Sequence, residues 1–132
     1  MYALPPRQEI RDGLRPTGVA CPDCGGVLGV VRDGYDSHPS FCCRVGHRFA
    51  LVTLLTSKEE RLEERLWSAL VAVEELIALL RDIDGDPALA RGLGDGARWR
   101  ERMGRGHQLA AHLRELIETD EPVDLSAGSP GT

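Results

Sequence analysis

The sequence predicts a small α+β protein in which a short β module precedes an antiparallel hairpin of two helices. Three observations predict this fold. All four cysteines lie between positions 17 and 56, among glycines and turn signals. Apolar residues then recur every three or four positions through two later stretches, which is the period of an amphipathic helix. A Gly-Asp-Pro break separates these two stretches and allows the chain to reverse.

Composition sets the class of protein. The chain has 132 residues, of which 42% are hydrophobic and 28% charged, as in globular proteins. Its formal net charge of −5 argues against a generally basic nucleic-acid binder. No apolar run reaches the ~18–20 residues of a membrane span, and the first residues lack the apolar stretch of a secretory signal. We therefore expect a cytoplasmic protein that does not enter a membrane.

Cysteine spacing predicts a metal site in the β module. Cys21-Pro-Asp-Cys24-Gly-Gly places two thiols in one short turn, and Cys43-Arg-Val-Gly-His47 supplies a second pair of ligands further along the chain. Three thiolates and an imidazole form a common tetrahedral site for structural zinc. We predict Zn²⁺ bound by Cys21, Cys24, Cys43 and His47. Short strands at residues 27–31 and 40–41, with a turn at Asp33-Gly34, complete the layout of a zinc ribbon.

Other uses of the cysteines stay open at this point. Disulfides need an oxidising compartment, and a redox pair of thioredoxin type needs a helix where Gly25-Gly26 stands. Cys42 has three interpretations: it replaces Cys43 as a ligand, it is a free redox-sensitive thiol, or it is a strand residue that faces away from the metal. His38 is a further candidate ligand, although its loop position favours a surface histidine. A site closed by four protein ligands is structural, because it leaves no position for a substrate.

The two helices have recognisable ends. Ser57-Lys-Glu-Glu60 is a capping box that predicts the start of the first helix. Gly85-Asp86-Pro87 ends that helix and starts the next, with Asp86 as N-cap and Pro87 at the first helical position. Glycines at 92–96 and 104–106 lower the helix propensity of the second stretch. If residues 92–96 form a loop, the second helix runs from about Ala97 to Glu118. The apolar stripe of the first helix contains Leu62, Leu66, Leu70, Val73, Ile77 and Leu80.

Four segments follow from these signals. Residues 1–16 form a flexible lead-in, 17–56 the zinc-ribbon-like module, 57–119 the helical hairpin, and 120–132 an acidic, Gly/Ser/Pro-containing disordered tail. Two helices alone make a thin core. The hairpin therefore needs either the β module or a second copy of the chain to cover it, which makes a homodimer through the helices one candidate assembly.

The helices also carry candidate interaction residues. Trp67 lies beside the apolar stripe, where it either seals the β module against the hairpin or stays exposed and anchors a partner. A basic cluster in the second helix could contact nucleic-acid phosphates, contact an acidic partner, or pair with acidic residues of the first helix. This cluster consists of Arg98, Arg100, Arg102 and Arg105.

The motifs together resemble a known type of sequence. They are the C-P-x-C-G-G-x-L string from Cys21, the F-x-C-x-V-G-H string ending at His47, and the helix with Leu66-Trp67-x-Ala-Leu70. This combination resembles the C-terminal extension of some bacterial chemotaxis-type protein-glutamate methylesterases, over residues 19–118. The resemblance implies Cys43 rather than Cys42 as the third cysteine ligand, and a link to bacterial signalling. The catalytic domain of those proteins is absent here, so esterase activity is not implied.

We therefore expect a zinc-stabilised adaptor or regulatory module that binds an unidentified protein partner. A thiol-based redox sensor, which releases zinc or a partner on oxidation, is the alternative. A nucleic-acid-binding zinc ribbon is the third candidate and the one that the net charge disfavours. No acid–base or nucleophile constellation indicates an enzyme.

Overall fold

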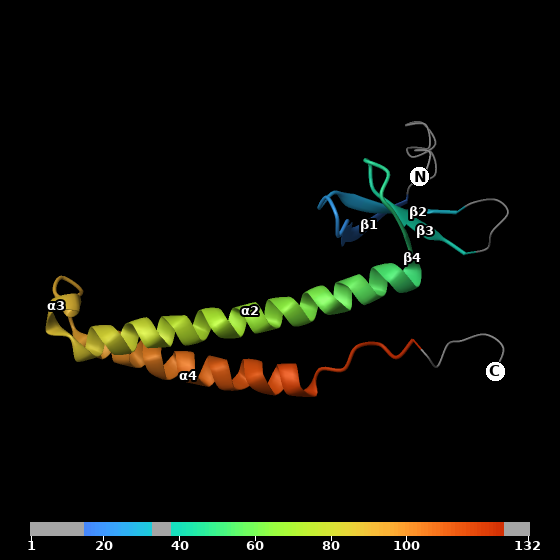
Figure 1. Cartoon of the computed structure of the whole chain (residues 1–132). Coiled ribbons are helices and arrows are strands. Elements are labelled where there is room, and N and C mark those ends of the chain that lie inside the picture. The colour runs from blue at the N-terminus through green and yellow to red at the C-terminus, as the bar shows by residue number, and fades with distance from the viewer. Residues whose placement is uncertain (1–14, 33–37, 126–132) are drawn as a thin grey trace. The chain divides into compact units, whose positions relative to one another are not determined.

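The computed structural model describes residues 15–32 and 38–125, which divide into two units (Figure 1). The first, here called the β unit, comprises the described residues up to Glu60 together with residues 124–125. The second, the hairpin unit, comprises Arg61–Val123. The predicted turn at Asp33-Gly34 and most of the predicted lead-in and tail lie outside the described residues.

The β unit contains one four-stranded antiparallel sheet of order β1-β2-β3-β4. Pairing places Val30 opposite Phe41 and Phe41 opposite Phe49. The strands predicted at 27–31 and 40–41 are confirmed as β2 and β3, whereas the two edge strands were not predicted. The strands are β1 Arg15–Ala20, β2 Val27–Val31, β3 Ser40–Cys42 and β4 Arg48–Ala50.

Edge strand β1 is stabilised by hydrogen bonds of the Thr17 side chain, one of them to the neighbouring strand. It contains Pro16 and Gly18, which weaken a strand pattern, and its pairing with β2 is irregular between Pro16 and Ala20. The Thr17 hydroxyl donates a hydrogen bond to the carbonyl of Leu28 at 2.8 Å and accepts one from the Val19 N–H at 3.1 Å. These bonds compensate for the interrupted ladder and explain why a sequence with poor strand propensity pairs here.

Helix α2 spans Leu51–Gly85 and begins directly after β4. The predicted start at Ser57 is therefore wrong, and the first turns of the helix belong to the segment expected to form the ribbon. Leu54 in these turns is buried against Cys21, Leu28 and Cys43. The burial of Leu54 against residues distant in sequence stabilises the helix before the capping box at Ser57, because the packing of an apolar face outweighs a local signal for the helix start.

The break after α2 is where the sequence predicts it. Asp86 accepts a hydrogen bond from the Ala88 N–H at 2.9 Å and caps helix α3, Pro87–Ala90. This helix has only four residues and is not the second long helix. After a loop, Asp95 caps helix α4, Gly96–Thr119, by accepting from the Ala97 N–H at 3.0 Å. The predicted helix from about 97 to 118 is thus confirmed to within one residue at each end.

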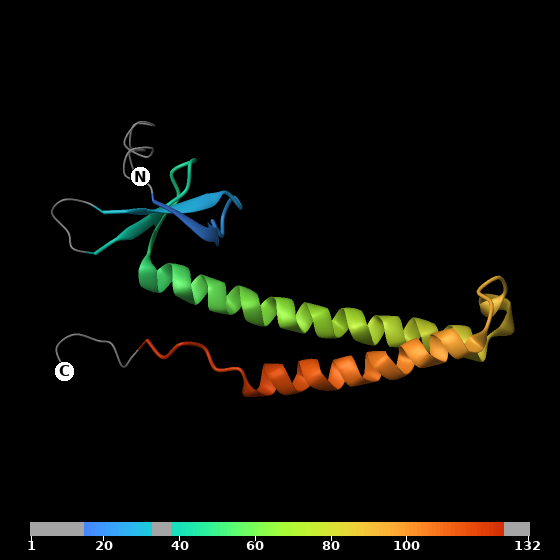
Figure 2. The same cartoon turned by 180° about the vertical axis from the view of Figure 1, so that it is seen from behind.

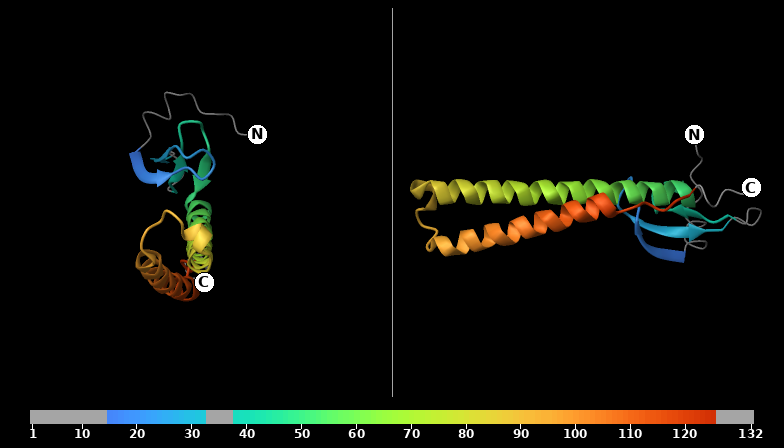
Figure 3. Two further views of the ribbon diagram at one scale, coloured as in Figure 1. Left: turned by 90° about the vertical axis from the view of Figure 1, so that its left-hand side faces the viewer. Right: turned by 90° about the horizontal axis from the view of Figure 1, so that it is seen from below.

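In the hairpin unit, α4 runs antiparallel to the second part of α2 (Figures 2 and 3). Leu70, Ile77 and Ala110 form the buried core of this unit. Polar contacts also join the two helices: Glu74 pairs with Arg114, and Asp84 accepts from Trp99 Nε1 at 2.9 Å and from Arg100 Nε at 3.0 Å. The predicted fold class, a β module followed by a helical hairpin, is confirmed. In the part of the chain that is described, no helix has both the length and the apolarity needed to cross a membrane.

Candidate metal centre

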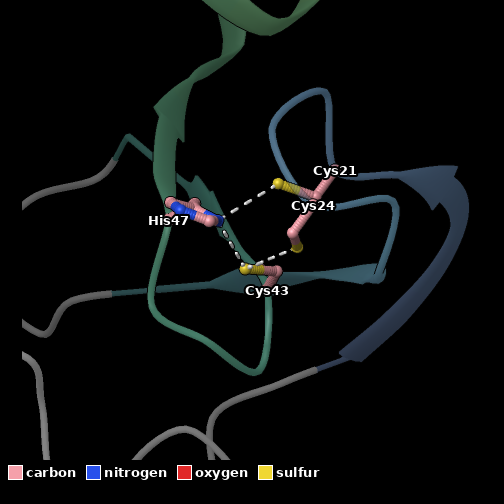
Figure 4. A group of neighbouring side chains, drawn as sticks. All are labelled: Cys21, Cys24, Cys43 and His47. Carbon is pink, nitrogen blue, oxygen red and sulfur yellow. Dashed lines mark hydrogen bonds between the residues drawn. The ribbon is translucent and has the colours of Figure 1, made fainter.

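Two loops of the β unit bring the predicted ligands together (Figure 4). Cys21 and Cys24 lie in the loop between β1 and β2, and Cys43 and His47 lie in the loop between β3 and β4. The sheet aligns the two loops, so that residues separated by 19 to 26 positions in sequence point toward one another. All four ligand atoms lie within 4.8 Å of one another, and this group can hold a metal ion.

Each loop is a tight turn stabilised by its own backbone. In the first loop the Cys21 N–H donates to the carbonyl of Gly26 at 2.7 Å, and the Gly25 N–H donates to the carbonyl of Cys21 at 2.9 Å. In the second, the Gly46 N–H donates to the carbonyl of Cys43 at 3.1 Å. Gly25 and Gly46 have φ values of 75° and 102°, a conformation that L side chains rarely adopt. The glycines of both motifs are therefore required by the turn geometry.

Distances between the ligand atoms fit a tetrahedral centre. At ordinary zinc–ligand bond lengths, tetrahedral geometry separates two sulfur ligands by about 3.8 Å and a sulfur from a nitrogen by about 3.6 Å. The Cys24 and Cys43 Sγ atoms are 3.6 Å apart. His47 Nδ1 lies 3.6 Å from Cys21 Sγ and 3.4 Å from Cys43 Sγ (Figure 4). These three donor–donor distances are thus close to those of a tetrahedral metal site with such ligands.

Acidity differs between the thiols of the cluster. At Cys43 burial raises the pKa, but backbone N–H groups of His47, Val45 and Gly46 outweigh it and lower the pKa to about 6. At Cys24 the Gly26 N–H lowers the pKa, yet desolvation and the neighbouring thiols leave it raised. One thiol therefore ionises readily while another resists. A divalent cation removes this conflict, because it neutralises the thiolates that repel one another.

The centre is continuous with the apolar core of the β unit. Cys21 and Cys43 are buried, His47 is half-buried, and Cys24 lies exposed at the surface. Leu54 of α2 packs against Cys21 and Cys43, with Val19, Phe41 and Phe49 around them. In addition, Lys58 donates a hydrogen bond from Nζ to the carbonyl of Ala20, the residue before Cys21, at 2.6 Å. The ligand loops and the first turns of α2 consequently stabilise each other.

Cys42 is not part of the cluster. Its side chain is fully buried, and its thiol donates to the carbonyl of Cys43 at 3.2 Å. Burial raises the pKa of this thiol, despite the opposing charge of Arg48. Burial and a raised pKa both lower thiol reactivity, so these features favour a strand residue that faces away from the metal over a redox thiol. His38 is exposed and also lies outside the cluster.

The candidate residues of the helices lie at the surface. Trp67, for which the sequence offered either a seal of the β module against the hairpin or an exposed anchor for a partner, is 48% exposed. Arg98 and Arg105 are exposed and Arg102 is half-buried, whereas Arg100 pairs with Asp84. The Asp84 pairing was not predicted from the sequence, because it depends on the register of the two helices. Hydrogen bonds from Trp99 and Arg100 lower the pKa of the Asp84 carboxyl.

Compared with known proteins, the chain matches no protein-family model, no curated protein and no solved structure.

Proposed function

We propose that this chain is a zinc-stabilised module for protein–protein interaction, with an adaptor or regulatory role. The observation that carries the proposal is the group of four ligands, Cys21, Cys24, Cys43 and His47, contributed by two loops. Four protein ligands complete a tetrahedral shell, so the metal stabilises a fold and offers no position for a substrate.

Zinc is the metal that suits these donors. Thiolate sulfur and imidazole nitrogen are the ligands of structural zinc sites, whereas magnesium and calcium prefer oxygen. The three donor–donor distances of 3.4 to 3.6 Å are close to those of a tetrahedral zinc site. Ion binding would contribute folding free energy directly, because the ligand loops come together only in the folded state.

The interaction role is supported by the surface of the hairpin unit. Large apolar side chains are exposed along both long helices: Leu79, at 56%, and Leu116, at 54%, lie on one side of the hairpin, and Trp67, at 48%, lies on the other. Exposed apolar side chains that gather on one face commonly mark a contact with another protein. We also propose, from the sequence resemblance, a relationship to the C-terminal extensions of bacterial methylesterases and a role in cytoplasmic signalling.

Two measurements test this function. Native mass spectrometry of the purified chain should show a single zinc ion per molecule. In cells that express the protein, a photo-crosslinking amino acid at Leu79 should capture a specific protein, and that protein should bind the purified zinc form in vitro. A chain without zinc, or one whose captured proteins do not bind when purified, would show that the proposed function is wrong.

A further inference from the structure

The hairpin unit has one face whose composition differs from the rest of its surface. The seam between α2 and α4 contains Leu70 and Ile77 on one helix and Gly106 and Ala110 on the other. Val73 and Leu113 pack against this core and belong to the seam as well. Glu74 is the next residue after Val73, Arg114 is the next residue after Leu113, and the side chains of Glu74 and Arg114 form an ion pair. Residues that follow the seam on each helix therefore share one side of the hairpin. Residues that stand one position before a seam residue in the sequence share the opposite side, as in antiparallel coiled coils.

We call this opposite side the leucine–arginine face. On α2 it contains Leu62, Arg65, Ala69, Ala72, Leu76, Leu79 and Ile83. On α4 it contains Arg98, Arg102, Arg105, Leu109, His112 and Leu116.

The apolar members of this face lack a covering element within the hairpin unit. Leu62 is 47% exposed and Leu109 is 42% exposed, while Leu79 and Leu116 are more than half exposed. Leu76 and Ile83 are half-buried at the edge of the seam. Together with Ala69 and Ala72, the apolar residues of α2 form a row along the helix, and Leu109 and Leu116 of α4 add two leucines on the same side. A third helix can pack against an apolar surface of this kind.

The charges on this face have one sign. Four arginines lie on it, and three of them, Arg98, Arg102 and Arg105, lie within two turns of α4. None of the acidic side chains between residues 62 and 83 or between 98 and 116 occupies a position on it. The acidic residues of these ranges lie in the seam, on the side of Glu74 and Arg114, or on the outer surface of the helices. Those of the outer surface are Glu75, Asp82, Glu101 and Glu115.

The positive charge of this face indicates which kind of molecule can bind to it. A second copy of the chain would bring arginine against a face that has no carboxylate to pair with it, and like charges in a desolvated contact are unfavourable. A partner with both acidic and apolar side chains suits this face, because its carboxylates would neutralise the arginines and its apolar side chains would cover the leucines. The apolar row from Leu62 to Ile83 is about 32 Å long, which matches a helix of about 20 residues.

We propose that the leucine–arginine face binds an amphipathic helix of a partner protein whose apolar stripe is flanked by glutamate or aspartate. The helix packs against this side of α2 and α4 and completes a three-helix bundle. Its acidic residues pair with Arg98, Arg102 and Arg105. This inference rests on the proposed interaction function and specifies the class of partner.

The experiment uses the full zinc-loaded chain and two fluorescent synthetic peptides of about 20 residues. Both have leucine at heptad positions a and d; one has glutamate at e and g, and the other has lysine there. Fluorescence anisotropy should show the acidic peptide binding at least about tenfold more tightly than the basic one at low salt. Raising the salt from about 50 to about 300 mM should weaken the acidic complex.

A matched pair of charge-reversal variants locates the site. Replacing Arg98, Arg102 and Arg105 with Glu should weaken acidic-peptide binding about tenfold or more, since three attractive pairs become repulsive. The same change at Arg61, Arg81 and Arg91, which lie off the face, alters the net charge equally and should have little effect. Circular dichroism checks that both variants keep their helices.

Several results would overturn the proposal. They are equal binding of both peptides, no binding at low salt by a folded chain, or equal losses in the two variants. A homodimer in sedimentation that Leu109→Glu dissociates would assign the face to a second copy. A labelled oligonucleotide that binds through Arg98, Arg102 and Arg105 would make it a nucleic-acid site. If the acidic peptide fails while a cellular partner binds the zinc form elsewhere, the proposed function remains and only this partner class is wrong.

Discussion

Gly106 of α4 faces Ile77 of α2, and a β-carbon at Gly106 would lie 3.0 Å from Ile77 Cγ1. The residue that lowers the intrinsic propensity of α4 thus allows the two helices to approach each other. Gly104, two residues earlier, has open space where its β-carbon would be. The two glycines lower helix propensity equally, but only Gly106 lies where a larger side chain would push the helices apart.

Leucine substitutions at these glycines should have opposite effects. Gly106→Leu should lower the free energy of unfolding of the hairpin unit by about 1–3 kcal/mol, because the added side chain overpacks the seam. Gly104→Leu should raise it by up to about 1 kcal/mol, because it restores helix propensity at an open position. Urea denaturation followed by Trp99 fluorescence in a Trp67→Phe background measures both. Equal stabilisation by the two changes would show that no seam constraint exists at Gly106.

Adjacent cysteines should differ in their effect on the metal. Cys43→Ser removes a ligand, so it should abolish stable zinc binding and unfold the β unit, since metal binding supplies folding free energy here. Cys42→Ala should retain zinc, because Cys42 lies outside the cluster. Native mass spectrometry measures the metal content, and amide hydrogen exchange of β2 and β3 measures the fold. Loss of zinc from Cys42→Ala alone would reverse the ligand assignment.

A leucine pair in α2 tests the connection between helix and metal centre. Leu54 is 5% exposed and packs against Cys21 and Cys43, whereas Leu51 is 55% exposed. Leu54→Ala should destabilise the β unit by about 2–5 kcal/mol and speed zinc transfer to a chromophoric chelator. Leu51→Ala should stay within about 0.5 kcal/mol of the parent. Similar transfer rates for the two variants would mean that Leu54 does not support the ligand loops.

Asp84 should make the stability of the hairpin unit depend on pH. Its folded-state pKa is lowered below the ordinary value of 3.8 by hydrogen bonds from Trp99 and Arg100. The stabilisation is therefore complete above pH 3.8 and is lost as the pH falls through the lowered folded-state pKa. Asp84→Asn should be less stable than the parent at neutral pH, and the difference should shrink in acid. Urea midpoints from circular dichroism at several pH values check this; a difference independent of pH would contradict it.

The metal ligands were predictable because the information for them is local. Each pair lies within five residues and carries the glycine that its turn requires, so Cys21-x-x-Cys24 and Cys43-x-x-x-His47 can be identified without knowing the fold. The structure brings these four predicted ligands together, with their donor atoms within 4.8 Å of one another. The end of α2 was predictable for the same reason, because Gly85-Asp86-Pro87 is a local signal and Asp86 caps the helix that follows, α3. The bounds of α4 were predicted only as the case in which residues 92–96 form a loop.

The start of α2 and the two edge strands could not be predicted, because they depend on distant contacts. The capping box at Ser57 is a correct local signal that the burial of Leu54 overrides. Strand β1 contains residues unfavourable to strands and is held by Thr17 against Leu28. Likewise, the exposure of Leu62 and the pairing of Asp84 follow from the register of α2 on α4, which periodicity alone leaves undefined.

Lys58 is the only lysine in the chain, and its amine donates to the carbonyl of Ala20 at 2.6 Å. Reductive methylation with isotope-labelled methyl groups would therefore place a single side-chain probe at the junction of β1 and α2. The chemical shift of that one probe would report whether the junction is closed, without any mutation of the metal ligands. The near absence of lysine, a peculiarity of composition, thus provides a specific spectroscopic reporter on the β unit.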